Sequence, residues 1–340
     1  MVRILSTDAV RDLLSLTELF PVVEDAFVKQ GRGEVERPAR PHFPVGIDVD
    51  RVRDGSGPNL PDGGASSCPP LGTALTMPAY IHGRDVYATK LVSVHSGNDE
   101  HGLPTLNAQV VLTDATTGLP LSLLDGTTLT NARTGCIGGL AVQYLAADPV
   151  RLGVIGAGTQ ARWQTRAIAA ASEVESISIF SPTKESREAC AADLRDEGLP
   201  AEAVLTPKEA VSDATVVVTA TTSVEPVFTG EWLDPGTLVV AIGAYTGEMQ
   251  ELGPVVFDRA AQVFADVPEE VAEIGDIREA GLSASDLVPL SDVFEGVAGR
   301  DGDDEILVVE SVGSAVLDAA TAEYLYNKAQ ERDVGEDIGL

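Results

Sequence analysis

The spacing of apolar residues divides the chain into two parts of different character. In the first part, apolar positions at helical spacing predict a helix pair over 7–31. Turn signals then separate segments with strand character, which are 75–80, 86–94, 106–114 and 120–124. These strands follow one another without crossover helices, which predicts an antiparallel sheet in an α+β domain.

From residue 127 onward, helix and strand patterns alternate along the chain. A helix over 127–147 is followed by segments of alternating type: 151–155, 159–172, 176–180, 184–197, 202–205, 207–212, 215–219, 237–242, 262–266, 303–309 and a last helix over 313–330. This order predicts the α/β class, with a doubly wound parallel sheet of Rossmann type. Between the predicted helix pair and the first predicted strand, the many glycine and proline residues over 46–72 predict a long exposed loop.

A glycine-rich turn joins the first predicted strand of this second part to its helix. The turn has the pattern Gly156-x-Gly158-x-x-Ala161. Gly156 allows a tight turn, Gly158 lets the backbone approach a pyrophosphate, and the first N–H groups of the helix face the phosphate. The strand before it and the helix after it make a dinucleotide site the expected function of this turn.

The end of the next predicted strand bears on the choice of cofactor. An acid there would bind the ribose hydroxyls of NAD, but this position holds Ser181, Thr183 and Lys184, with Arg187 one turn later. Hydroxyl and cationic groups suit a 2′-phosphate, so we expect a preference for NADP(H). The alternative is a neutral strand end that also accepts NAD(H).

Cations are scarce in the first part, and three of them are candidates for binding a carboxylate. Lys90 is one of only five lysines in the chain and lies inside a predicted strand; Arg133 lies on the helix that enters the second part. Arg40 precedes a proline in a proline-rich segment, whose rigidity would aim its guanidinium. The alternatives are a surface lysine, an ordinary helix salt bridge and a solvated loop arginine. Three converging cations would bind an α-carboxylate in a cleft between the domains.

A series of ordered motifs extends this interpretation to the family level. They are Met77-Pro78-Ala79-Tyr80, Thr89-Lys90-Leu91-Val92, Gly102-Leu103-Pro104-Thr105, Asp114-Ala115-Thr116-Thr117-Gly118, Asp125-Gly126, Arg133-Thr134-Gly135, the glycine turn and Ser311-Val312-Gly313. The series resembles the ornithine cyclodeaminase/μ-crystallin family from about residue 7 to 331. That family contains ornithine and lysine cyclodeaminases, archaeal alanine dehydrogenases, ketimine and pyrroline-2-carboxylate reductases, and hormone-binding μ-crystallins.

The resemblance implies roles for individual residues. Arg40, Lys90 and Arg133 would contact the substrate carboxylate, with Lys90 nearest the chemistry, and Met77 and Gly313 would also line the substrate site. The cofactor would be held by Gly156, Gly158, Thr159, Gln160, Ser181, Thr183, Lys184, Thr221, Thr134 and Ser311. The resemblance further implies a homodimer formed through a substrate domain made of 1–126 plus 312–340, beside a nucleotide domain of 127–311.

One position departs from the pattern of the deaminating members. They carry an aspartate in a Gly-x-Asp turn after the strand equivalent to 237–242, where this chain has Tyr245. A tyrosine, with an ordinary pKa of about 10, is a poor base at neutral pH. We therefore expect reduction of a small cyclic ketimine, with Glu248 or Glu251 as the only nearby substitutes for the base. The alternatives are an ornithine cyclodeaminase or alanine dehydrogenase, and a non-catalytic binder of NADPH and a ligand.

Composition indicates the environment of the protein rather than its chemistry. A formal net charge of −30, from 53 acids against 23 bases, predicts a solvated acidic surface that repels nucleic acid and anionic membranes. Such a surface suits a host with high salt. Because the sequence has no run of about 18 apolar residues and no basic-then-apolar start, we expect a cytoplasmic protein. The acids over 266–276 are expected to be solvated as well. Four scattered histidines and three cysteines form no metal-binding or disulfide spacing, and Cys136 is expected in the core.

Overall fold

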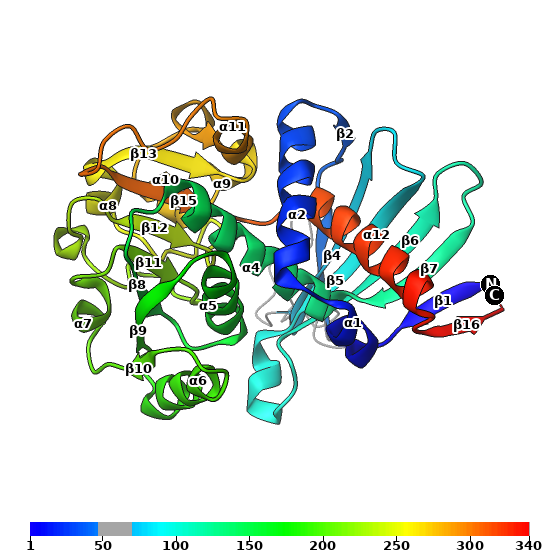
Figure 1. Cartoon of the computed structure of the whole chain (residues 1–340), viewed down its shortest axis with the longest axis horizontal. Helices are drawn as coiled ribbons and strands as arrows, with labels where there is room; N and C mark the ends of the chain where they lie inside the picture. Colours follow the sequence, from blue (N-terminus) through cyan, green and yellow to red (C-terminus); the bar gives the residue numbers. More distant parts are fainter. Residues whose placement is uncertain (47–69, 340) are drawn as a thin grey trace, which may run out of the picture. The chain divides into compact units, whose positions relative to one another are not determined.

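The computed structural model describes residues 1–46 and 70–339. These residues form two compact units (Figure 1). Unit 1 comprises Met1–Leu13, Val35–Thr130 and Asp318–Leu340, and unit 2 comprises Leu14–Glu34 and Asn131–Leu317. Most of the loop predicted over 46–72 lies outside the described residues. The predicted division into substrate and nucleotide domains stays a prediction.

Unit 1 is built on an eight-stranded sheet with the order β16-β1-β7-β6-β5-β4-β2, and β3 also pairs with β4. Its strands are β1 (Val2–Leu5), β2 (Val35–Glu36), β3 (His42–Val45), β4 (Gly72–Ile81), β5 (Val86–Val94), β6 (Leu106–Asp114), β7 (Pro120–Asp125) and β16 (Glu336–Ile338). The four strands predicted from the sequence are present and pair antiparallel, as expected. Two strands were not predicted from the sequence. Strand β1 pairs parallel to β7, and β16 pairs antiparallel to β1 and so brings the two chain ends together (Figure 1).

Strand β5 shows how the alternating pattern sets the two faces of this sheet. Ala88, Lys90 and Val92 are buried on one face, whereas Leu91 points the other way and is 46% exposed. Helices α1 (Thr7–Leu13) and α12 (Ala315–Arg332) lie next to the sheet (Figure 1). A lysine therefore occupies a buried position that the alternation would ordinarily give to an apolar residue.

Unit 2 contains the predicted parallel sheet, with the strand order β10-β9-β8-β11-β12-β15-β13-β14. The strands are β8 (Val150–Ile155), β9 (Val174–Phe180), β10 (Ala201–Ala203), β11 (Val216–Thr219), β12 (Leu238–Ala241), β13 (Ala260–Ala265), β14 (Val288–Pro289) and β15 (Ile306–Glu310). Every pairing in this sheet is parallel. The α/β Rossmann expectation is confirmed, because the order of these parallel strands reverses direction between β8 and β11, as it does in a doubly wound sheet.

Helices connect and flank these strands. They are α2 (Leu16–Gly31), α4 (Gly126–Leu145), α5 (Thr159–Ala171), α6 (Lys184–Asp196), α7 (Pro207–Val211), α8 (Pro254–Arg259), α9 (Pro268–Val271), α10 (Gly275–Glu279) and α11 (Leu290–Phe294), with 3₁₀ turns at Gly230–Trp232 and Ala284–Asp286. A further 3₁₀ turn, Ser96–His101, lies between β5 and β6 of unit 1. The short helices after β12 were not predicted, because four to six residues give too little periodicity to detect.

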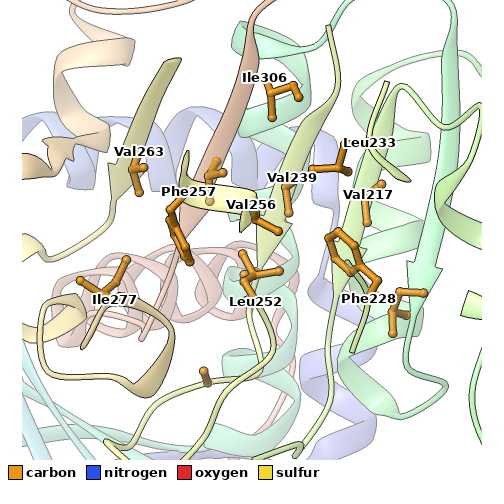
Figure 2. Packing of buried hydrophobic residues seen from close by; sticks show 14 of the residues in the cluster. Val217, Phe228, Leu233, Val239, Leu252, Val256, Phe257, Val263, Ile277 and Ile306 are labelled. Atoms are coloured by element: carbon orange, nitrogen blue, oxygen red, sulfur yellow. The ribbon is translucent and has the colours of Figure 1, made fainter. Parts of the chain in front are cut away.

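The core of unit 2 lies against its parallel strands. Val217 of β11, Val239 of β12 and Ile306 of β15 pack with side chains from the connecting segments, such as Phe228 and Leu252 (Figure 2). Strands β11, β12 and β15 are fully buried, which explains their continuous runs of valine, isoleucine and leucine. This core fixes the carboxyl ends of the strands, where ligands of such sheets bind.

Among the described residues, no helix combines the length and the apolar character that a membrane crossing requires. The same residues contain no group of three or more His, Cys, Asp or Glu side chains arranged to hold a metal ion. Cys136 is fully buried, as expected, and burial raises the pKa of its thiol.

Candidate functional site

The glycine turn of unit 2 has the backbone that a nucleotide-binding loop requires. Gly156 follows β8 with φ +118°, and a Cβ atom there would lie 2.4 Å from the carbonyl oxygen of Ala220, so the position demands glycine. Gly158 is the N-cap of α5, and the space beside its Cα contains no atom within 4 Å of where a Cβ would stand. A ligand can therefore approach the backbone at Gly158 directly, which fits a pyrophosphate.

The first turn of α5 is held by polar contacts that the sequence did not reveal. Arg162 pairs with Asp193 of α6, with an N–O distance of 2.7 Å, and donates to the carbonyl oxygens of Ala157 and Gly158. The side-chain amide of Gln160 donates to Asn131 at 2.8 Å. These contacts fix the turn in advance of any ligand. Thr159, also predicted to bind the cofactor, is exposed at the first position of the helix.

The end of β9 keeps the composition on which the cofactor expectation depends. Thr183 and Lys184 are exposed and Ser181 is half-buried. Lys184 lies 3.7 Å from Glu188 one turn along α6, and the Arg187 guanidinium donates to the Ser181 carbonyl oxygen at 2.9 Å. The loop between β9 and α6 is therefore braced by a cation, with a second cation at its exposed edge.

A buried carboxylate ties together the loops that follow β11 and β12. Glu251 is fully buried and accepts hydrogen bonds from Thr219 Oγ1 at 2.9 Å, from the Thr221 amide at 2.6 Å and from the Gly243 amide at 2.8 Å. Burial raises the pKa of Glu251, and these three donors oppose that rise. Glu251 thus braces the backbone around Thr221, a predicted cofactor residue, and is a structural acceptor rather than an exposed base.

Two further acids lie in the same interior. Asp276 accepts hydrogen bonds from the amides of Glu251 and Leu252, and the buried carboxyl group of Glu310, the last residue of β15, lies close enough to interact with it electrostatically. Burial, with the nearby carboxylates, raises the pKa of Asp276 to about 7 and that of Glu310 well above its ordinary value. A negative charge on Asp276 makes a second one on Glu310 costly, which adds to the effect of burial on the pKa of Glu310.

The expectation that the acids over 266–276 are solvated was wrong for Asp266 as well as for Asp276. Asp266, just after β13, is 3% exposed and accepts hydrogen bonds from Ser311 Oγ at 2.6 Å and from the Gly313 amide at 2.7 Å. Gly313 has φ +80°, and a Cβ there would lie 2.7 Å from an Nη atom of Arg133. Asp266 therefore holds the loop 311–313 against the Arg133 guanidinium. Asp266 and Arg133 are far apart in the sequence, so no local pattern could have predicted this arrangement.

Arg133 itself lies on α4 and is only 4% exposed, and Thr134 beside it is 7% exposed and accepts a hydrogen bond at its carbonyl oxygen from Gln164. This burial is consistent with a functional arginine, although its predicted role in binding a carboxylate stays a prediction.

Lys90 has a defined partner within unit 1. Its Nζ atom lies 2.6 Å from Oδ2 of Asp318 on α12 and donates to Thr130 Oγ1 at 3.4 Å. Met77, the other predicted residue in this sheet, is 5% exposed and stands opposite Lys90 in the β4–β5 register. Arg40 lies half-buried in the segment between β2 and β3. The role of Asp318 was not predicted. The signal that could have indicated it is a single acid within the largely apolar segment Ala315–Ala322, every residue of which is buried in the structure.

The turn after β12 contains Tyr245 and Glu248 on its exposed side. Tyr245 is 47% exposed, and partial burial raises the pKa of its phenol further from neutrality. Glu248 is exposed to solvent. The described residues of this turn therefore offer a tyrosine hydroxyl and one solvated carboxylate, with Glu251 engaged in the interior.

A separate surface hollow of about 890 Å³ lies elsewhere in unit 2. It is lined by the end of α4 and by residues around Pro149, Val150 and Glu175, at the amino ends of β8 and β9. Ligands of doubly wound sheets bind at the carboxyl ends of the strands, so this hollow is not the predicted nucleotide site.

Known proteins share both the sequence pattern and the fold. The profile of the ornithine cyclodeaminase/mu-crystallin family matches residues 69–333. A Delta(1)-pyrroline-2-carboxylate reductase of Bacillus cereus is 38% identical over 275 residues, covering 78% of this chain and 84% of the relative. The solved structure of Thermococcus litoralis Delta(1)-pyrroline-2-carboxylate reductase in complex with NADH and L-proline superposes with a TM-score of 0.88 at 29% identity, covering 99% of this chain and 100% of that one.

An archaeal alanine dehydrogenase dimer with bound NAD gives a TM-score of 0.86 at 28% identity, with 99% of each chain covered. The likeness to these proteins extends over both units, and the family profile covers most of the chain. The chain therefore belongs to the ornithine cyclodeaminase/mu-crystallin family.

Proposed function

We propose that this protein reduces a small cyclic imino acid, of the pyrroline-2-carboxylate type, with a reduced nicotinamide dinucleotide. The relatives named above support a reaction at a C–N bond. The observation that favours reduction over cyclodeamination is the turn after β12, where Tyr245 stands and the buried Glu251 already accepts three hydrogen bonds. Deamination needs a base near the substrate nitrogen, whereas reduction of a preformed, protonated imine does not.

The residues of the chain supply binding and orientation. When bound, the reduced nicotinamide supplies the hydride, which adds to the C=N carbon; the nitrogen retains its proton and becomes a secondary amine. We assign the carboxylate of the substrate to Lys90, Arg133 and Arg40, because ammonium and guanidinium groups pair strongly with carboxylates. The buried positions of Lys90 and Arg133 would strengthen such contacts, since water competes less there.

For the cofactor, we propose the glycine turn with Thr159 and Gln160 as the pyrophosphate site and a preference for NADPH over NADH. Ser181, Thr183 and Lys184 support that preference, because they present hydroxyls and a cation where an acid would select NAD. Solved relatives hold NADH or NAD, so the choice must be measured on this chain. Loss of charge-assisted contacts to the 2′-phosphate costs about 1.5–3 kcal/mol, or roughly ten- to a hundredfold in affinity. Fluorescence titration of both cofactors tests this, and equal or tighter binding of NADH would refute it.

We also propose a homodimer formed through unit 1. Leu91 of β5 and Leu123 of β7 project from the sheet face opposite Lys90 and are 46% and 37% exposed. Exposed leucines on one sheet face are typical of an interface between copies, and one of the solved relatives is described as a dimer.

The deciding experiment measures turnover with three kinds of substrate under matched conditions. These are a cyclic imino acid with NADPH, pyruvate with ammonia and NADPH, and ornithine with NAD⁺ or NADP⁺ as hydride acceptor and with ammonia detection. We expect NADPH oxidation with the cyclic imine and little ammonia from ornithine. Because general base catalysis contributes about 10²–10⁴-fold, the rate of ammonia release should be lower by that factor than in an enzyme that has the base. Robust ammonia release from ornithine would overturn the proposal, and binding without any turnover would instead indicate a protein that only holds its ligands.

A further inference from the structure

The surroundings of Lys90 are apolar on both sides along the sheet. Its register partners are Met77 on β4 and Val110 on β6, and its neighbours on the same face of β5 are the buried Ala88 and Val92. Only 2% of the lysine side chain is exposed. An ammonium in such surroundings is costly unless an anion and further hydrogen bonds compensate for the lost water.

Asp318 provides that compensation from a distant part of the chain. Its side chain is 1% exposed, and its Oδ2 lies 2.6 Å from Lys90 Nζ, while Thr130 accepts from the same Nζ at 3.4 Å. Asp318 is the fourth residue of the 18-residue helix α12, where the partial positive charge of the helix N-terminus favours a carboxylate. The helix position favours the ionised form of Asp318, and the pairing favours the ionised forms of both side chains.

We propose that Asp318 is the positioning residue for Lys90, holding its Nζ in place as a charged ammonium. This inference rests on the proposed function for its consequence, which is that Lys90 acts as a fixed cation for the substrate carboxylate and not as a neutral amine. In this role Asp318 acts through Lys90. Its removal therefore leaves a lysine that is less well oriented and less strongly charged.

The test is a double-mutant cycle with Lys90→Met, Asp318→Asn and the double variant, assayed for NADPH oxidation with a cyclic imino acid. Asp318→Asn keeps the shape of the side chain and removes its charge. We expect it to lower kcat/KM about thirtyfold or more, mainly through KM, because it removes one member of a buried charge pair. In the Lys90→Met background the same substitution should change kcat/KM less than about threefold.

A matched control and a conservative variant separate positioning from general damage. Glu323→Gln breaks another contact of α12, the 3.6 Å pair with Arg84, at a partly exposed place, and should leave kcat/KM unchanged. Asp318→Glu should restore part of the lost kcat/KM, since it returns the charge. Equal losses from Asp318→Asn with and without Lys90 would overturn the proposal, as would full activity of Asp318→Asn.

The same double-mutant cycle, followed by urea unfolding, measures the coupling between Lys90 and Asp318 without any assumption about the reaction. If the wild-type protein does not reduce the imine, the proposed function fails; strong coupling between Lys90 and Asp318 in unfolding then still supports the positioning of the ammonium. Additive effects of the two substitutions on the unfolding midpoint would contradict the pairing itself, whatever the substrate proves to be.

Discussion

Replacement of Glu251 tests whether the buried brace in unit 2 supports the fold as its contacts indicate. Glu251→Ala removes the acceptor of two backbone amides, those of Thr221 and Gly243, and of the Thr219 hydroxyl. The hydroxyl can rotate, whereas the two amides are fixed by the chain. We therefore expect the free energy of unfolding to fall chiefly through these two unsatisfied donors.

The magnitude follows from their number and burial. At about 1–2 kcal/mol for each part-buried amide, Glu251→Ala should cost about 2–4 kcal/mol. Glu251→Gln should cost about half of that, because two donors share Oε2 and one uses Oε1. A glutamine can keep its carbonyl oxygen at the shared position, and its NH₂ group then faces only the Thr221 amide.

Urea unfolding and thermal melting of the wild type and the two variants measure this series. For a unit of this size, 2–4 kcal/mol lowers the melting temperature by about 5–15 °C. Glu248→Gln is the matched control, since that carboxylate belongs to the same segment but is exposed, and it should change stability by less than about 0.5 kcal/mol. If Glu251→Ala is as stable as the wild type, or if Glu248→Gln destabilises as much, the reasoning is wrong.

Three further measurements address other features of the molecule. The raised pKa values of Glu310 and Asp276 mean that the native state binds more protons than the unfolded state. The free energy of unfolding should therefore fall as pH rises from about 4 toward and past 7, by at most about 1.4 kcal/mol per pH unit and proton. Glu310→Gln should make this slope shallower, and an unchanged slope in urea titrations would contradict the raised pKa of Glu310. The net charge of −30 predicts that the melting temperature rises between low and molar KCl, because salt screens repulsion, and a melting temperature independent of KCl would show that this charge is harmless. Leu123→Lys should shift the mass measured by light scattering from dimer to monomer, and the same dimer mass in that variant would place the interface elsewhere.

Local sequence determined the regular part of this protein. The period of the apolar residues is a property of neighbouring positions, so it predicted the parallel sheet of unit 2 and the four consecutive strands of unit 1. The preference for glycine at Gly156 is partly local, because its φ of +118° arises in the turn between one strand and one helix, whereas its close approach to the Ala220 carbonyl oxygen depends on the fold. Strands β1 and β16 are short, and only their pairing with each other and with β7 stabilises them, so they gave no recognisable pattern.

The partners of the charged side chains were decided only by the tertiary structure. The sequence identified Lys90 as unusual, but its pairing with Asp318 depends on α12 packing on a sheet built from much earlier residues. The acids at 266 and 276 looked like the many solvated acids of this chain, but the fold buries Asp266 just after β13 and Asp276 in α10. Burial and pairing depend on which segments meet in space, and a linear pattern of residue types does not contain that information.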